Sequence, residues 1–419
     1  MMNRATLIKN MVAEYQAALP TYTVMQRYYR GDHDIIYKVW SNPKRCNKIC
    51  IENFISKFVD EEVNYVLGNP LSFVSKSGNP EIIHAIDTNL FHWKTNHNVL
   101  MMRDLEIYGK VYSLSYIDRK GRYCERILNP TNAIAYCDDD GVPQLFIHFY
   151  KKKYDADPYY DVYDSNGNIE VYRNGALVGK KTHLFHGCPV SVCEMENVCE
   201  TIFSKIRHLQ DTYNETLSDQ ASIVGDYRNA YLVVTGVEVN DEIAKRMEDH
   251  GLLNLPSDKN ASVHWLMKEL NDAYIQNILD DLRNAMYSVC NHIDGNEKLQ
   301  SNTSSLAIRS RLIFLEQRAK AMFDYIQDAL YDRIERLFEY LSLKGYSYSV
   351  DDVQINYTPN IPVDLVTTVQ VISQLGEKLS TETALSLLPF VESPAIELEK
   401  IKKERAEAEM IDLDKIGGG

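Results

Sequence analysis

The chain has 419 residues, 45% of them hydrophobic, and a formal net charge of −14. This length can bury more than one hydrophobic core and predicts several modules. The acidic balance excludes a protein that holds DNA through a broad basic surface, because neutralisation of phosphates by lysine and arginine supplies most of the non-specific affinity. The longest basic run is residues 151–153, followed by the pair Lys180 and Lys181. We expect a DNA partner to pass along this protein without being held by it.

Neither the cysteines nor the hydrophobic runs indicate secretion or a membrane. The eight cysteines are too sparse for a disulfide scaffold in a chain of this size, so we expect reduced thiols. No stretch approaches the roughly 18 apolar residues that span a bilayer, and no long apolar segment follows Arg4 and Lys9. We expect no membrane partner and assembly in the cytoplasm.

The first half of the chain predicts two helices followed by a β-rich region. The helices cover residues 1–16 and 48–67, and Gly68, Asn69 and Pro70 end the second. Between residues 111 and 192, alternating Tyr, Ile and Val runs are separated by the turn sequences DRKG, CDDDG, DSNG and RNG, which predicts a largely antiparallel region. The Asn174-Gly175 pair is typical of a type I′ hairpin turn.

One short span of this region contains side chains that zinc prefers. They are His183, His186, Cys188, Cys193 and Cys199. The spacing lacks a tight Cys-x-x-Cys pair, and several of the positions fall on an apolar strand. The pattern favours structural roles, and we expect no metal.

The remaining chemical motifs are incomplete. Gly175, Gly179 and Lys180 resemble a phosphate-binding loop, but only three residues separate the glycines and the context is a hairpin. Residues 138–140, followed by Gly141, place three carboxylates together, yet Asp-Gly is a strong turn signal and two-metal nucleases draw their carboxylates from separate elements. No His-Glu-x-x-His or Gly-x-Ser-x-Gly motif is present. We expect no catalytic residues and no cofactor.

The second half predicts three helices. Apolar residues recur at helical spacing over residues 202–224 and again over residues 275–289, and the segment between them contains the β-branched run AYLVVTGVEV and the turn-prone PSDKN. A third apolar stripe runs from residue 303 to residue 341 without Gly or Pro, with Thr303 or Ser304 as a cap. It predicts one helix of roughly 58 Å, which favours an assembly strut over the wall of a small active site. Near the C-terminus, Ser393-Pro394 begins a mixed-charge helical segment or a solvated tail.

The order of these elements and a series of short motifs resemble the portal proteins of tailed bacteriophages, specifically the siphophage type that forms a ring at the head-to-tail vertex. The matching positions are Tyr29, Gly31, Asp32 and Ile35; Asn47, Lys48, Asn53, Val59, Asp60, Tyr65, Gly68, Asn69 and Pro70; Tyr108, Gly109, Tyr112, Tyr116, Asp118 and Gly121; Gly187, Pro189 and Val190; Asp211, Tyr213, Asn214, Ser218 and Asp219; and Ser380, Glu382, Thr383 and Leu385. They extend over nearly the whole chain. Ser304 and Ser305 stand where the family commonly has Ser-Gly, so the hinge there is expected to be stiffer.

The resemblance implies an α+β portal fold. Its parts would be an α/β wing at residues 1–197, stem helices at 198–225 and 269–292, a small β-containing clip at 226–268, a tunnel loop at 293–303, a long wing helix at 304–344, and a helical crown with the C-terminal tail at 345–419.

The resemblance also implies a function: a ring-shaped channel, a dodecamer in the family, through which double-stranded DNA passes during packaging and ejection. The expected partners are other copies of the chain, the terminase large subunit, a head-completion adaptor protein, and the major capsid and scaffolding proteins. The protein would reside at the capsid vertex of the virion after assembly in the host cytoplasm. Force would come from terminase, since the chain lacks a nucleotide site. The tunnel-loop residues Asp294, Asn296, Glu297, Lys298 and Gln300 would face the channel, and the clip residues Asp226, Tyr231 and Trp265 would contact head-completion proteins.

Two other classes of function share parts of this pattern. A metal-dependent nuclease acting on phage DNA would use the acidic turn or the His/Cys cluster, and a scaffold without a channel would share the long helix and the negative charge. Electron microscopy separates these alternatives from a portal, because a ring with a central hole excludes both.

Overall fold

The computed structural model describes residues 3–38, 47–90, 96–196, 200–226, 231–235, 262–266, 272–294, 305–360 and 365–386, together with residues 245, 388, 391, 397–398 and 400–404. The chain divides into two compact units. The first comprises Met1–Lys298 with Arg311–Pro359, and the second comprises Leu299–Ser310 with Asn360–Gly419. In the second unit, the described helices are α9 (Leu365–Leu375), the short 3-10 turn η5 (Gly376–Lys378) and α10 (Thr381–Ser386).

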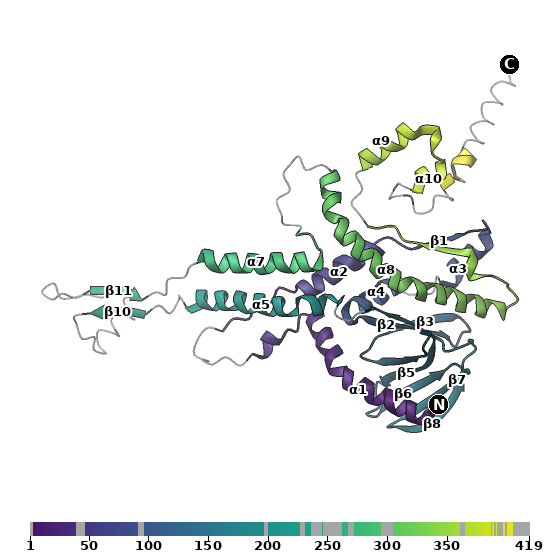
Figure 1. Ribbon diagram of the computed structural model, residues 1–419, viewed down its shortest axis with the longest axis horizontal. Helices are drawn as coiled ribbons and strands as arrows, with labels where there is room; N and C mark the ends of the chain where they lie inside the picture. The colour runs from purple at the N-terminus through teal and green to yellow at the C-terminus, as the bar shows by residue number, and fades with distance from the viewer. Residues whose placement is uncertain are drawn as a thin grey trace, which may run out of the picture. The chain divides into compact units, whose positions relative to one another are not determined.

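The first unit begins with helices and then forms two antiparallel sheets (Figure 1). The helical part contains α1 (Arg4–Tyr29), the 3-10 turn η1 (Asp34–Tyr37), α2 (Phe54–Leu67), α3 (Pro80–Leu90) and α4 (His97–Tyr108). A five-stranded sheet has the order β4 (Ala133–Cys137), β5 (Pro143–Lys151), β6 (Pro158–Asp164), β7 (Asn168–Arg173) and β8 (Ala176–Thr182). A three-stranded sheet has the order β3 (Tyr123–Leu128), β2 (Lys110–Ile117) and β9 (Val190–Glu194). The predicted antiparallel region is confirmed.

The alternation of side chains along β5 explains how these layers stack. Leu145 and Ile147 point to one face and pack with Ile8 and Met11 of α1. Phe146, between them in sequence, points to the other face and packs with residues of β2, β3 and β9. Because successive strand residues face opposite sides, one strand contributes to both hydrophobic clusters. The five-stranded sheet therefore lies between α1 and the three-stranded sheet.

The β7–β8 hairpin forms as its sequence predicts. Asn174 has φ of 50° and Gly175 has φ of 79°, the two left-handed positions that a type I′ turn requires. A pairing that the sequence did not predict joins β1 (Ser72–Ser75) antiparallel to β12 (Val353–Asn356), with the 3-10 turn η4 (Val350–Asp352) just before it. It ties residues far apart in the sequence.

The long helix is confirmed as α8 (Ser305–Ser342), 38 residues and roughly 57 Å. Its proposed caps, Thr303 and Ser304, lie outside the described residues. The buried stripe of α8 between Leu315 and Leu341 packs in the first unit, and two arginines fasten it there. Arg336 donates to Ser191 Oγ at 2.6 Å and to the Val190 carbonyl at 3.0 Å, while Arg333 donates to Asn98 Oδ1 at 2.6 Å.

The extent predicted for the first helix is wrong. It was expected over residues 1–16, but α1 continues to Tyr29 with Pro20 inside it. Proline removes one backbone hydrogen bond, and tertiary contacts of the second half of the helix offset that loss. Met25 and Tyr28 are buried, and Gln26 Nε2 donates to Tyr108 Oη at 3.0 Å.

The start predicted for the second helix is also wrong. It was expected at residue 48, but α2 begins at Phe54, with the Asn53 side chain accepting from Ser56 N as its N-cap. The residues before Asn53 are not helical because side chains of another helix bind their backbone, as the next subsection describes.

Candidate functional site

Two long helices pack side by side and carry the strand pair that the sequence predicted (Figure 1). The first, α5 (Ile202–Asp226), leads towards β10 (Tyr231–Thr235), and α7 (Asp272–Cys290) returns from β11 (Ser262–Leu266). The two strands pair antiparallel, with Leu232 opposite Trp265. The predicted helix, strand-bearing insert and second helix are therefore confirmed.

Both helices are acidic. Four acidic and two basic residues give α5 a net charge of −2, and three aspartates and one arginine give α7 the same net charge. Asp280 and Asp281 lie on the exposed side of α7. The single arginine of α7, Arg283, is paired with Asp294, with 2.8 Å between Nε and Oδ2. The two helices therefore carry more acidic than basic residues, a balance that disfavours binding of a polyanion.

A row of polar side chains on α5 binds the backbone of the extended segment before α2. Gln210, Asn214, Ser218 and Ser222 repeat every four residues, and all are buried. Their side chains accept hydrogen bonds from the backbone N–H groups of Phe54 at 2.8 Å, Glu52 at 3.1 Å, Cys50 at 2.9 Å and Lys48 at 2.9 Å, respectively. Gln210 Nε2 also donates to the Glu52 carbonyl at 2.7 Å. We call this set the α5 ladder.

The α5 ladder works because two periodicities nearly agree. Four residues of a helix rise about 6.0 Å, and two residues of an extended chain rise about 6.6 Å. Every fourth residue of α5 can therefore meet every second residue of the segment. The N–H groups of Lys48, Cys50 and Glu52 are therefore satisfied without a sheet.

The α5 ladder also fixes the protonation state of a buried histidine. His33 Nε2 lies 3.0 Å from the Tyr28 carbonyl, and His33 Nδ1 lies 2.8 Å from the Asn214 amide nitrogen. The carbonyl can only accept and the amide nitrogen can only donate, so Nε2 carries the proton and Nδ1 does not. Burial lowers the pKa of His33 below its ordinary value, which agrees with a neutral ring.

A cluster of buried charges connects the end of α7 to α2, α4 and α8; we call it the Glu62 cluster. Arg318 Nε lies 2.6 Å from Glu62 Oε1, and its terminal nitrogen lies 3.2 Å from Glu106 Oε2 and 3.3 Å from the Glu200 carbonyl. His292 places Nε2 2.8 Å from Glu62 Oε1 and Nδ1 2.8 Å from Glu61 Oε2. The side chains of Glu62, Glu106 and His292 are 0% exposed.

The charges in the Glu62 cluster balance. Burial would raise the pKa of Glu62, but Arg318 and His292 outweigh it and hold the pKa at about 2. Burial and the neighbouring Glu62 raise the pKa of Glu106 well above its ordinary value, which favours the neutral, protonated form of Glu106. With His292 protonated, two cations face the carboxylates of Glu61 and Glu62. The cluster then holds no uncompensated buried charge, which would be costly.

The structure describes only some of the residues predicted from the sequence. Asp294 is described, and its side chain is 15% exposed and bound to Arg283. Asn296, Glu297, Lys298 and Gln300 lie outside the described residues. In the strand-bearing insert, Asp226 is the last residue of α5, Tyr231 the first of β10, and Trp265 lies in β11. The channel-facing and partner-contacting roles of all these residues stay predictions.

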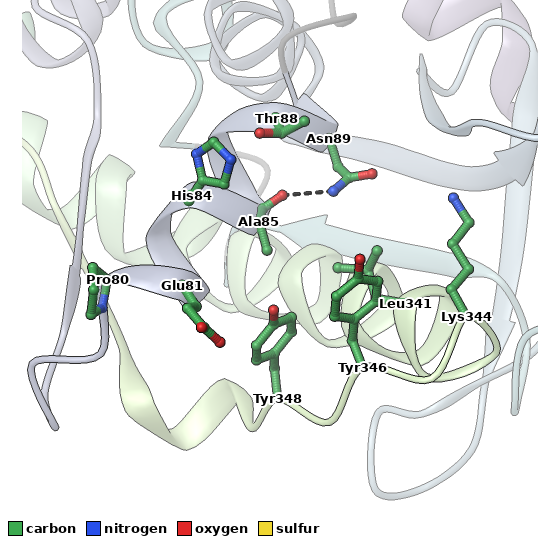
Figure 2. A pocket seen from close by; sticks show the side chains of 10 residues that line it. All are labelled: Pro80, Glu81, His84, Ala85, Thr88, Asn89, Leu341, Lys344, Tyr346 and Tyr348. Carbon is green, nitrogen blue, oxygen red and sulfur yellow. Dashed lines mark hydrogen bonds between the residues drawn. The ribbon is translucent and has the colours of Figure 1, made fainter.

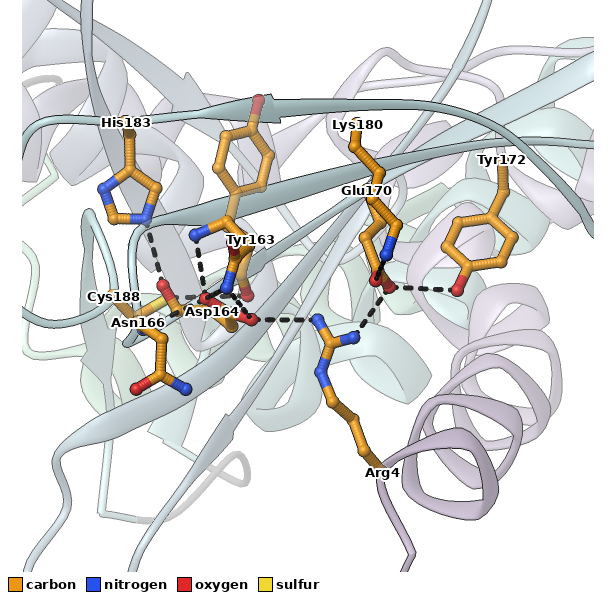
Figure 3. A network of polar contacts seen from close by, with 10 residues as sticks. Arg4, Tyr163, Asp164, Asn166, Glu170, Tyr172, Lys180, His183 and Cys188 are labelled. Atoms are coloured by element: carbon orange, nitrogen blue, oxygen red, sulfur yellow. Dashed lines mark hydrogen bonds and ion pairs between the residues drawn. The ribbon is translucent and has the colours of Figure 1, made fainter.

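The candidate zinc ligands that are described have other partners or are buried. His183 Nε2 donates to the Asp164 carbonyl at 2.9 Å (Figure 3). His186 contacts Glu339 at 2.5 Å. Burial raises the pKa of Cys188 to about 12, which disfavours the thiolate that binds metal. Cys193 is buried, and Cys199 lies outside the described residues. Within the part of the chain that is described, no group of three or more His, Cys, Asp or Glu side chains could hold a metal ion.

The two other incomplete motifs are structural. Lys180 lies in β8 and forms an ion pair with Glu170 at 3.5 Å; Glu170 also binds Arg4 at 2.8 Å, which fastens α1 to the sheet (Figure 3). Asp138 Oδ1 accepts from the backbone N–H groups of Asp140 and Val142 at 3.1 and 2.8 Å, as a turn-forming aspartate does.

A cavity of about 610 Å³ lies between α3 and the end of α8. Figure 2 shows Tyr346, Tyr348 and Lys344 on one side of it and Glu81 and His84 on the other. The two tyrosine rings are stacked with centroids 5.9 Å apart, and Tyr346 is 53% exposed. The lining therefore combines two aromatic rings with one lysine, one glutamate and one histidine.

The Glu62 cluster was missed by sequence reasoning, although a signal existed. Glu62, Glu106 and Arg318 each occupy a core-facing position of an otherwise apolar helical stripe. Charged residues are almost never fully buried unless they are paired, so opposite charges at core positions of different helices predict that the helices meet there.

Comparisons with known proteins agree with these observations. Residues 8–410 match the family model described as "Phage portal protein, SPP1 Gp6-like". No curated protein matches the sequence. Within the described residues, none of the helices combines the length and hydropathy that crossing a bilayer requires.

The solved structures that resemble the chain include two from gene transfer agent (GTA) particles. A chain of "Virion of native gene transfer agent (GTA) particle" is 10% identical with a TM-score of 0.49, and the match covers 87% of this chain and 92% of that chain. A chain of "Neck of empty GTA particle computed with C6 symmetry" is 11% identical with a TM-score of 0.48, and the match covers 79% and 89%. Because both TM-scores lie below 0.5, the family match alone identifies the chain.

Proposed function

Because the chain belongs to the SPP1 Gp6-like family of phage portal proteins, a structural family and not one of enzymes, we propose that it forms a ring-shaped channel at the capsid vertex. Double-stranded DNA would pass through this channel during packaging and ejection. The observation that carries the proposal is the acidic pair α5 and α7, whose net charge of −2 on each helix suits a wall along which DNA slides. A basic wall would trap the duplex, since every neutralised phosphate adds affinity.

The proposed parts follow the family. Residues 1–197 and the long helix at 304–344 would form the wing, α5 and α7 the stem, residues 226–268 the clip, residues 293–303 the tunnel loop, and residues 345–419 the crown and tail. The clip would dock terminase and a head-completion adaptor, the wing and crown would meet capsid and scaffolding proteins, and the assembled ring would reside in the virion. The family's dodecamer is the proposed ring size.

Electron microscopy of the purified protein tests this proposal. We expect rings with a central hole. Large, obligate interfaces between neighbouring copies of the chain would hold each ring together. Light scattering that detects only monomer across concentration and salt, even with scaffolding or capsid protein added, would contradict it.

Changing the charge of the tunnel loop is expected to slow packaging. Asn296→Lys with Glu297→Lys adds three positive charges per subunit and leaves the Arg283–Asp294 pair intact. At a salt dependence near −0.9 per phosphate neutralised, even ~6 simultaneous contacts would convert a sliding surface into a tight collar at low salt. We expect normal rings that package DNA slowly or stall, with partial rescue by added salt, in a packaging assay with terminase.

The matched control places the same charge change elsewhere. Asp139→Lys with Asp140→Asn also adds three charges, in the exposed turn before β5. It should package at the wild-type rate. If both variants package DNA at the wild-type rate at low and at high salt, residues 296 and 297 do not face DNA.

Deleting the proposed clip is expected to separate folding from docking. Replacing residues 229–265 with a short flexible linker leaves α5 and α7, which pack directly against each other. We expect the variant to be soluble, with a helical circular dichroism signal that matches the wild type once the deleted residues are allowed for. In a pull-down it should not bind the adaptor or terminase. Loss of all soluble protein would instead show that the insert belongs to the core.

A further inference from the structure

His292 lies two residues after the end of α7 and immediately before the proposed tunnel loop. Its side chain is 0% exposed, and its ring stacks on Phe58 of α2 with centroids 4.4 Å apart. Both ring nitrogens contact carboxylates of α2, Nδ1 at 2.8 Å from Glu61 and Nε2 at 2.8 Å from Glu62. The exit of α7 is therefore fastened to α2 through one imidazole.

This geometry requires a proton. A neutral imidazole has a single N–H, so one of its nitrogens would present a lone pair to a carboxylate oxygen at 2.8 Å. The imidazolium donates from both nitrogens, and both contacts become charge-assisted hydrogen bonds. The observed arrangement is thus attractive on both sides only for protonated His292.

The surroundings also favour the charged ring. The carboxylates of Glu61 and Glu62 are the anions in contact, and Arg318 satisfies the rest of Glu62. The elements packed around His292 carry the following titratable and charged groups: Lys57, Glu61 and Glu62 of α2, Glu106 of α4, Lys205 of α5, Arg283, Tyr287 and Cys290 of α7, Asp294, and Arg318 of α8. Burial of His292 disfavours its charge, but the hydrogen bonds to Glu61 and Glu62 outweigh it and raise the pKa above the ordinary value.

We propose that His292 is a positioning residue whose protonated ring clamps the exit of α7 to α2, and that loss of the proton releases the clamp. The clamp sets where the chain leaves the helix pair at the start of residues 293–303. The inference rests on the proposed function in one respect, the channel role of those residues.

Hydrogen exchange on the assembled wild-type protein tests the proposal. The measured quantity is the protection of peptides that cover residues 287–294, corrected for the intrinsic pH dependence of amide exchange. In the closed state the clamp is formed and His292 has a raised pKa; in the open state the clamp is released and His292 has its ordinary pKa. At pH values between these two pKa values, opening releases a proton. The opening equilibrium constant should therefore rise about tenfold per pH unit in that window and be flat below it.

Three variants make the result specific. His292→Gln should show no pH dependence and the low protection of the wild type at high pH. His208→Gln, an exposed histidine on α5, should follow the wild type. Glu61→Gln removes a carboxylate whose side chain is 38% exposed, so folding should survive while the upper edge of the window, set by the raised pKa of His292, moves to lower pH.

A wild type without pH dependence, a His292→Gln variant that follows the wild type, or an unchanged window in Glu61→Gln would each overturn the proposal. The Glu61→Gln result decides the matter should His292→Gln fail to fold. None of these readouts depends on DNA passage, so a failure here is distinct from a failure of the channel proposal.

Discussion

Replacing Arg318 with methionine is expected to destabilise the protein by about 3–5 kcal/mol, the cost of breaking a buried ion pair by removing one partner. Arg318 contacts Glu62 at 2.6 Å and Glu106 at 3.2 Å, and its side chain is 6% exposed. Without it, the Glu62 carboxylate keeps only His292 as a counter-ion inside the core. Urea unfolding followed by circular dichroism would measure the loss.

Two controls distinguish lost charge from lost packing. Lys320→Met removes a cation from the exposed side of the same helix and should change the free energy of unfolding by less than about 0.5 kcal/mol. Combining Arg318→Met with Glu62→Gln removes both charges and keeps an acceptor for His292, so at least half of the lost stability should return. An Arg318→Met variant as stable as Lys320→Met would show that the Glu62 cluster contributes nothing.

The long helices could be predicted because their signal is local. The apolar stripe of α8 repeats at helical spacing for ten turns without Gly or Pro, and the actual bounds differ from the prediction by one or two residues. The hairpin at Asn174 and Gly175 is equally local, because the turn type follows from two adjacent residues.

The errors occurred where distant residues decide the local structure. Residues 48–53 resemble the start of a helix, yet their backbone is extended because Asn214 and Ser218, more than 160 positions later, bind its N–H groups. Likewise α1 passes through Pro20 because Met25 and Tyr28 gain a buried environment further along. Local propensity is a weak prior that tertiary contacts override.

The candidate site divides in the same way. Acidic helices were foreseeable from composition, whereas the contact of His292 with Glu61 and Glu62 joins residues some 230 positions apart. The family resemblance had drawn attention to Asn214 and Ser218, but their function, binding a backbone, follows from the matching rises of a helix and an extended chain.

Replacing Asn214 with leucine is expected to cost about 2–4 kcal/mol. It leaves the buried Nδ1 of His33 and the part-buried N–H of Glu52 without partners, at about 1–3 kcal/mol for each unsatisfied group. Thr212→Ala is the matched control, because Thr212 lies on the exposed side of α5 and bonds only within its own helix. Urea unfolding should place this control within about 0.5 kcal/mol of the wild type.

Residue 214 should also control how the free energy of unfolding depends on pH. In the wild type burial lowers the pKa of His33, and the Asn214 amide nitrogen beside Nδ1 cannot accept a hydrogen bond from a protonated ring. The contribution of His33 to stability is therefore complete above the ordinary pKa of histidine and is lost as the pH falls below that value and through the lowered pKa. Asn214→Asp keeps an acceptor for Glu52 and offers a second oxygen to a protonated His33, so the pKa of His33 should rise. The stabilisation would then be present at low pH and lost as the pH increases.

Comparing the two proteins between pH 5 and pH 7 isolates the effect of residue 214 and His33, because His292 and the carboxylates that both proteins share contribute equally. We expect the difference in unfolding free energy, Asn214→Asp minus wild type, to become steadily more favourable to the variant as the pH falls. A difference that is constant with pH would show that His33 does not titrate against residue 214. The α5 ladder would then hold the segment before α2 through its amide and hydroxyl groups alone.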